Sequence, residues 1–146
     1  MFTSIDLWAV LVATVIAYLA GWAWYSPFLW QKSWMKARGD NGTDWEQHGK
    51  KEMPKIVIYG LLNTFAEALT IAVFLAVTGV TTLTGSLQVA LLLCFGFVVT
   101  IKFNDLLYTA TPPHWGKRAQ MLFLIDSGYQ IVVFCVVASI LWWMTL

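Results

Sequence analysis

Long apolar stretches separated by short polar segments dominate the pattern of this chain. They cover residues 7–25, 56–80, 83–101 and 121–146. A membrane-spanning helix needs about 20 mainly apolar residues. In hydrocarbon a helix also satisfies its own backbone groups within one segment. The pattern therefore predicts an all-α fold, a bundle of four transmembrane helices at about 7–25, 56–80, 83–104 and 121–145.

The composition supports a membrane location and excludes several protein classes. Of 146 residues, 59% are hydrophobic and 12% are charged, whereas soluble domains are about 45–50% apolar and about 25% charged. We expect a single integral membrane domain over 1–146 with the lipid bilayer as its partner. A net charge of +1 argues against nucleic-acid binding. The two cysteines, Cys94 and Cys135, lie in apolar stretches, so we expect free thiols.

The positive charges predict an orientation. The loops 26–55 and 106–120 hold nearly all of them, and the N-terminal segment, the 81–86 turn and the C-terminus hold none. The cations are Lys32, Lys36, Arg38, Lys50, Lys51, Lys55, Lys117 and Arg118, with Lys102 just inside the third stretch. Because cytoplasmic loops carry the excess of Lys and Arg, we expect both loops inside and both termini outside.

Tryptophans gather where these spans would meet water. Trp8, Trp142 and Trp143 lie at the expected outer boundary. Those at or near the inner boundary are Trp22, Trp24, Trp30, Trp34 and Trp115. This placement is typical of the aromatic belts of membrane proteins. The alternative is a tryptophan-lined ligand site.

The first loop predicts a short interfacial helix. Ser26 and Pro27 suit an N-cap and a first helical position, and Gly39 suits the residue after the end of a helix over 28–38. Residues 43–46 form a possible capping box, and Pro54 is expected to begin the second span. We expect Asp44, Glu46 and His48 to be solvated, because their spacing does not place three metal ligands on one helical face. No metal site is predicted.

Small residues recur at every fourth position of the first two spans. In the first span they are Ala9, Ala13, Ala17 and Gly21; in the second they are Gly60, Thr64, Ala68, Ala72 and Ala76. Small residues allow membrane helices to approach closely. We therefore expect the two spans to pack through these stripes, with a subunit interface or a chance pattern as the alternatives.

Polar residues inside the spans are the candidate functional groups. They are Asn63 and Glu67 in the second span, Lys102 in the third, and Asp126, Tyr129 and Gln130 in the fourth. Asn63 and Asp126 lie roughly 10 Å into their spans, and Glu67 and Gln130 roughly 16 Å. We expect Glu67 to face the bundle or a subunit interface near Gln130 and Tyr129. The side chain of Lys102 is long enough to reach Asp126. These groups either join helices by hydrogen bonds or line a site.

Two sequence blocks resemble a known family. The first block is Trp24-Tyr25-Ser26-Pro27, followed by Lys32 and Trp34-Met35; the second is Gly96-Phe97, Thr100, Lys117 and residues 122–130. Both resemble domain-of-unknown-function family 1761, small bacterial four-helix membrane proteins. Asp126 stands where that pattern has asparagine. The resemblance implies a multi-pass protein of the bacterial inner membrane and no catalytic residues.

No enzyme motif is present, and we expect neither enzymatic activity nor a cofactor. We expect an oligomer of this chain that binds or permeates a proton, an ion or a small polar solute through its intramembrane polar groups. The alternative is a structural or assembly subunit in which those groups only pack helices.

Overall fold

The computed structural model describes residues 5–39, 49–109 and 115–145, and they are helical apart from short turns. The elements are α1 (Leu7–Trp24), α2 (Gln31–Arg38), α3 (Lys50–Thr78), α4 (Leu83–Leu93), a π-helical turn (Cys94–Val99), α5 (Thr100–Asn104), a second π-helical turn (Asp105–Thr109) and α6 (Lys117–Thr145).

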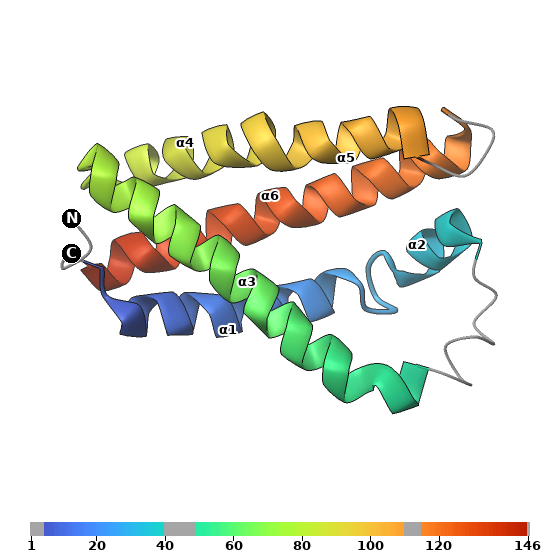
Figure 1. Cartoon of the computed structure of the whole chain (residues 1–146), viewed down its shortest axis with the longest axis horizontal. Coiled ribbons are helices and arrows are strands. Elements are labelled where there is room, and N and C mark those ends of the chain that lie inside the picture. Colours follow the sequence, from blue (N-terminus) through green and yellow to red (C-terminus); the bar gives the residue numbers. More distant parts are fainter. Residues whose placement is uncertain (1–4, 40–48, 110–114, 146) are drawn as a thin grey trace.

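Four helices are long and apolar enough to cross a membrane: Leu7–Trp24, Lys51–Thr78, Leu83–Tyr108 and Lys117–Thr145. This confirms the predicted all-α bundle of four membrane-span helices with a short helix after the first. The long α4–α5 helix, α6 and α1 run side by side, and α3 crosses them at an angle (Figure 1).

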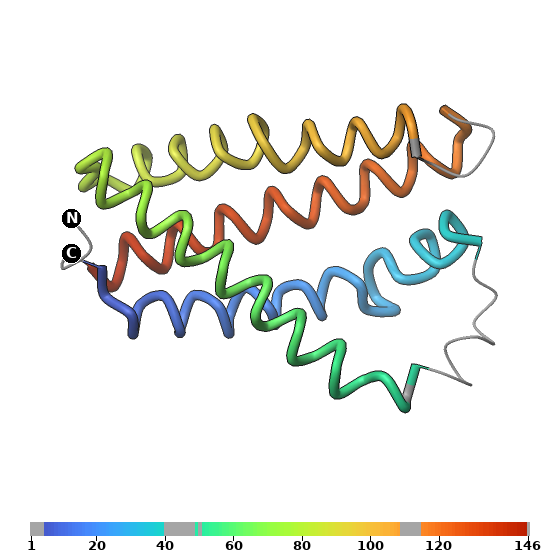
Figure 2. The backbone as a smooth tube through the Cα atoms, in the orientation of Figure 1, coloured from blue at the N-terminus to red at the C-terminus, as the bar shows by residue number. Residues whose placement is uncertain are grey.

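Successive long helices run in opposite directions (Figure 2). The start of α1, the end of α3, the start of α4 and the end of α6 therefore lie together, and we call this the termini end. The opposite end holds α2 and the starts of α3 and α6. Lys and Arg occur only in α2, the start of α3, α5 and the start of α6, so we call it the basic end.

Helix ends follow local chemistry, and three helices begin at other residues than predicted. Asp6 caps α1 by accepting the N–H groups of Trp8 and Ala9. The interfacial helix begins at Gln31 instead of residue 28, because the Ser26 carbonyl accepts the N–H groups of Leu29 and Gln31 and closes a turn first. Its end is as predicted, with Gly39 at φ 77°.

The second span begins at Lys50, before Pro54. A proline this close to a helix start removes one hydrogen bond near the exposed end, and the helix tolerates it. The third span continues past residue 104 to Tyr108 and contains the two π-helical turns. The fourth begins at Lys117, ahead of the predicted residue 121.

The helix α6 is the centre of the packing, since it contacts α1, α2, α3 and α4. The small residues of α1 and most of those of α3 are buried. A Cβ on Gly60 would lie 2.7 Å from the Tyr18 ring, so α1 and α3 approach closely there. Gly21 instead faces α6, where a Cβ would lie 2.9 Å from Tyr129. The stripe of α1 therefore serves two neighbours.

Candidate functional site

Side chains from α1, α2 and α6 meet at Asp126, at the basic end. The Tyr25 hydroxyl donates to Asp126 Oδ1 at 2.7 Å. The indole Nε1–H of Trp34 donates to the same oxygen at 3.1 Å. Trp24 donates its indole N–H to the backbone carbonyl of Ile125 at 3.1 Å. We call Trp24, Tyr25, Trp34 and Asp126 the aromatic clamp.

Ring packing reinforces the aromatic clamp. The Tyr25 ring lies 5.2 Å from the rings of both Trp34 and Tyr129, measured between centroids. Such tilted aromatic pairs contribute about 0.5–1.5 kcal/mol beyond the area they bury. A Cβ on Gly128 would lie 3.0 Å from the Trp24 ring, so a larger residue at this position would press on the indole.

The clamp gives two of the tryptophans assigned to the belt a role inside the protein. Trp24 and Trp34 are partly buried and use their N–H groups inside the protein. Trp8 and Trp143 remain exposed, as belt residues would be. An indole has an apolar ring and one N–H donor, so it suits both a membrane interface and a hydrogen bond inside the protein. The position of a tryptophan in the sequence therefore did not distinguish a belt residue from a clamp residue.

Two arginines border the outside of the clamp. The Arg38 guanidinium lies over the Trp34 ring, 4.5 Å from its centroid. Arg118, in the first turn of α6, reaches the Ala37 carbonyl at 3.4 Å. Together with Trp34, these contacts hold α2 against the start of α6.

Tyr25 lies just beyond the last residue of α1, and its hydroxyl is a stable donor. Burial raises the pKa of Tyr25 well above its ordinary value, and the hydrogen bond to Asp126 raises the pKa further. Both effects disfavour the charged phenolate. The hydroxyl therefore keeps its proton through the neutral range and the bond to Asp126 persists.

A second polar group lies midway along α3 and α6. The Asn63 amide donates to Glu67 Oε1 at 3.0 Å. Gln130 and Lys102 also interact with the Glu67 carboxylate. Tyr129 lies within range of an electrostatic interaction with the same carboxylate. We call Asn63, Glu67, Lys102 and Gln130 the midspan cluster.

The midspan cluster is short of hydrogen-bond donors. Among the described residues, Glu67 Oε2 and Gln130 Oε1 are buried and have no hydrogen-bond partner. The hydroxyl of Ser127, one turn from Gln130 on α6, is also buried and has no hydrogen-bond partner among the described residues. An unsatisfied buried polar atom costs about 1–3 kcal/mol. The two acceptor oxygens are therefore suited to a bound proton, cation or water.

Residues of both sequence blocks that carried the resemblance thus meet at the clamp, with Trp24, Tyr25 and Trp34 of the first block bonded to Ile125 and Asp126 of the second. The family model described as "Protein of unknown function (DUF1761)" matches residues 8–142. The chain belongs to this family. No curated protein and no solved structure matches the chain.

Within this DUF1761 chain the motif residues divide into two sets. Trp24, Tyr25 and Trp34 form the aromatic clamp. Lys32 and Pro27 are exposed, and the Ser26 carbonyl serves the turn before α2. Ser26, Pro27 and Lys32 take no part in the hydrogen bonds of the clamp.

The polar residues of the spans also separate, which sequence reasoning missed. Asp126 is bonded by Tyr25 and Trp34 and forms no ion pair with Lys102, so the Lys102–Asp126 contact that the sequence allows is not formed. Lys102 acts on Glu67 instead. The cause is the position of α2, which brings Trp34 to Asp126 and leaves the cation to the midspan.

Metal and thiol chemistry find little support in the described residues. No group of three His, Cys, Asp or Glu side chains in 5–39, 49–109 and 115–145 could hold a metal ion. The loop residues Asp44, Glu46 and His48 lie outside the described residues. Cys94 and Cys135 are free, as predicted.

Proposed function

We propose that this protein is an oligomeric membrane protein that binds, and allows to pass, a proton or a small cation at Glu67. The observation that carries the proposal is the pair of buried acceptor oxygens, Glu67 Oε2 and Gln130 Oε1, that have no donor among the described residues. A proton on Glu67, or a cation between the two side chains, would satisfy both oxygens.

The electrostatics of the midspan favour such a ligand. An unpaired carboxylate at the centre of a bilayer costs about 3 kcal/mol on insertion scales, and such groups usually mark ion or proton pathways. Lys102 offsets part of the charge of Glu67, but it leaves Oε2 without a hydrogen bond. Asn63, which donates to Glu67, is itself exposed, so the cluster reaches the surface of the subunit.

The exposure of Asn63 also supports an oligomer in the proposal. Polar side chains in membrane helices face protein or water in preference to acyl chains. Asn63 lies on the same face of α3 as the exposed Tyr59 and Ala66. A second copy of the chain against this face would cover the amide and enclose the midspan cluster.

The location and orientation in the proposal rest on charge. We propose the bacterial cytoplasmic membrane, with the basic end inside and the termini end outside, because cytoplasmic loops carry the excess of Lys and Arg. We assign no catalytic residue and propose no enzymatic activity.

A structural role is the alternative function, and the aromatic clamp favours it. The Tyr25, Trp34 and Trp24 donors all have acceptors inside the protein. A chain that served only to hold α2 on α6, and thereby to present α2 to a membrane complex, would need this clamp and no midspan ligand.

Proton flux into vesicles tests the proposal. The purified chain is reconstituted in liposomes that contain a pH-sensitive dye, and a potassium diffusion potential drives protons inward. We expect wild-type vesicles to acidify faster than empty ones, and Glu67→Gln to acidify at the empty-vesicle rate. Glu52→Gln is the matched control, because Glu52 is paired with Lys55 at the start of α3, outside the cluster.

Equal rates for wild type and Glu67→Gln would contradict a proton pathway. The same vesicles, assayed with a sodium- or potassium-sensitive dye under an ion gradient, test the cation form of the proposal. If Glu67→Gln matches wild type for protons and for both cations, the structural alternative stands.

A further inference from the structure

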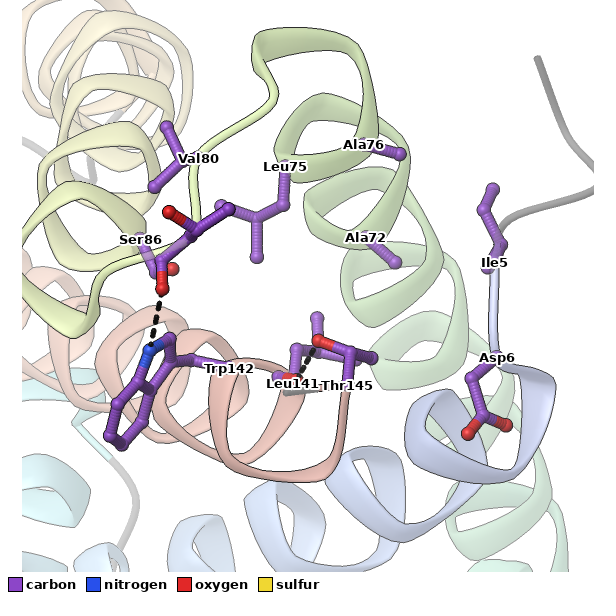
Figure 3. Close-up of a pocket in the computed structure, with 11 residues that line it drawn as sticks. Ile5, Asp6, Ala72, Leu75, Ala76, Val80, Ser86, Leu141, Trp142 and Thr145 are labelled. Carbon is purple, nitrogen blue, oxygen red and sulfur yellow. Dashed lines mark hydrogen bonds between the residues drawn. The ribbon is translucent and has the colours of Figure 1, made fainter.

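A pocket of about 170 Å³ lies at the termini end, away from both groups described above. It is formed where the start of α1, the end of α3, the start of α4 and the end of α6 come together (Figure 3). For comparison, an apolar cavity of about 150 Å³ holds one benzene molecule. The pocket therefore suits a solute of about six non-hydrogen atoms and is too small for a nucleotide or a lipid headgroup with its glycerol.

Asp6 gives this pocket its charge. Of the residues that line it, Asp6 is the only one with an ionisable side chain. Every Lys and Arg of the chain falls between residues 32 and 55 or at positions 102, 117 and 118, far along the helices toward the basic end. A cation in the pocket would thus meet one carboxylate and no competing positive side chain from the described residues.

The geometry of Asp6 leaves an oxygen for a ligand. Both capping hydrogen bonds, from the N–H groups of Trp8 at 2.9 Å and Ala9 at 3.3 Å, end on Oδ1. The other carboxylate oxygen has no part in these bonds. The cap also fixes the side chain at the rim of the pocket, so no ordering of a long flexible chain opposes binding.

Three of the other polar side chains of the wall donate to backbone carbonyls. The Trp142 indole N–H donates to the Thr81 carbonyl at 3.2 Å, and the Thr145 hydroxyl donates to the Leu141 carbonyl at 2.6 Å. The Ser86 hydroxyl donates to the Thr82 carbonyl at 3.0 Å. With these donors used, the pocket offers little to an anion or a sugar.

The rest of the wall is apolar, with Ala72, Ala76 and Leu141 facing the space and the Trp142 ring beside it. A hydrated alkali ion would gain nothing from these surfaces. An organic ammonium ion would place its charge at Asp6 and its carbons against Ala72 and Ala76, which lie on the Asp6 side of the pocket (Figure 3).

We propose that this pocket binds a small organic ammonium ion, with the charged nitrogen at Asp6 and the alkyl part between α3 and α6. The proposal does not depend on Glu67. Evidence against binding at one of the two sites leaves the proposal for the other site unchanged.

Calorimetric titration of the purified chain in detergent micelles tests the proposal, with empty micelles subtracted. The probe is n-butylammonium, and 1-butanol is its neutral counterpart of equal size. Potassium ion and butyrate test a hydrated cation and an anion. At this pocket we expect saturable binding of n-butylammonium only. Potassium ion bound at Glu67 would be lost in Glu67→Gln and kept in Asp6→Asn.

Two variants separate charge from space. Asp6→Asn keeps an N-capping oxygen and removes the charge, so the fold is retained. We expect it to weaken n-butylammonium binding about three- to fivefold, the change that one solvent-exposed ion pair supplies. Ala76→Phe fills the pocket and keeps the charge, and should abolish binding. Glu67→Gln is the control and should bind as wild type does.

The proposal is overturned if wild type does not bind n-butylammonium, or if Asp6→Asn binds it as tightly as wild type. It is also overturned if potassium ion or 1-butanol competes equally with n-butylammonium. None of these results bears on proton flux through Glu67, which is measured on a different variant.

Discussion

The aromatic clamp and the midspan cluster both hold a carboxylate in a span, but they treat it in opposite ways. At the clamp, one oxygen of Asp126 receives two donors, Tyr25 and Trp34. At the midspan, Glu67 receives Asn63 on one oxygen, and its other oxygen is buried without a donor in the described residues. Among the described residues, the second oxygen of Glu67 is a buried atom without a hydrogen-bond partner and that of Asp126 is not. Only Glu67 therefore lacks a donor that a ligand could supply.

The convergence of both donors on Asp126 Oδ1 also explains a sequence feature. An asparagine side chain has one amide oxygen, which can accept two hydrogen bonds. The clamp therefore requires an acceptor at this position and not a charge. An asparagine at position 126, the residue expected from the resemblance, could accept the same two hydrogen bonds.

The largest expected effect comes from removing that acceptor. Asp126→Leu leaves the Tyr25 hydroxyl and the Trp34 N–H without a partner, which should lower the free energy of unfolding by about 2–4 kcal/mol. Asp126→Asn is the matched variant and should stay within about 1 kcal/mol of wild type. Thermal unfolding in detergent measures both, and equal losses for the two variants would show that the charge matters.

A slightly smaller loss should follow from crowding the clamp. Gly128→Ala places a Cβ 3.0 Å from the Trp24 ring, and overpacking of this kind costs about 1–3 kcal/mol. Gly96→Ala is the control, since no atom lies within 4 Å of a Cβ there. Equal losses in the free energy of unfolding for Gly128→Ala and Gly96→Ala would contradict tight packing at the clamp.

Glu67→Gln should change stability little or raise it by up to about 1 kcal/mol. The amide removes a carboxylate from the centre of the bundle and can donate a hydrogen bond to the unpaired Gln130 oxygen. The same unfolding assay checks this. A loss as large as that of Asp126→Leu would mean that the Glu67 carboxylate is itself part of the structural core.

The smallest effect at neutral pH concerns Tyr25. Because its pKa is raised in the folded state, its contribution to stability is fully present below the unfolded value of about 10 and is lost as pH rises toward the folded value. The free energy of unfolding should therefore show no Tyr25-dependent change from pH 6 to 9, and should fall in alkali. Tyr25→Phe should reduce that alkaline loss, and an identical pH profile for the variant would contradict the assignment.

Spans could be predicted from the sequence because hydropathy is a sum over many residues. The stop at Gly39 could be predicted too, because a left-handed residue ends a helix locally. The start of α2 depended on how the Ser26 carbonyl was shared, and two competing local hydrogen-bond patterns fit the same residues.

The clamp could not be predicted because its contacts are remote. Tyr25 and Asp126 are separated by 101 positions, and Trp34 and Asp126 by 92. Depth counting matched Asn63 with Asp126 and Glu67 with Gln130. It gave no information on the rotation of α6 or on where α2 folds back. Gln130 could be predicted as a neighbour of Glu67 because the two residues lie at the same depth in their spans. The structure agrees, since Gln130 interacts with the Glu67 carboxylate.

Proton flux compared between Glu67→Gln and Asp126→Asn vesicles tests the central claim most directly. Each variant changes one intramembrane carboxylate to its amide, and both are measured in the same liposomes at equal protein density. The account predicts empty-vesicle flux for Glu67→Gln and wild-type flux for Asp126→Asn. Wild-type flux through Glu67→Gln, or loss of flux in Asp126→Asn alone, would contradict it.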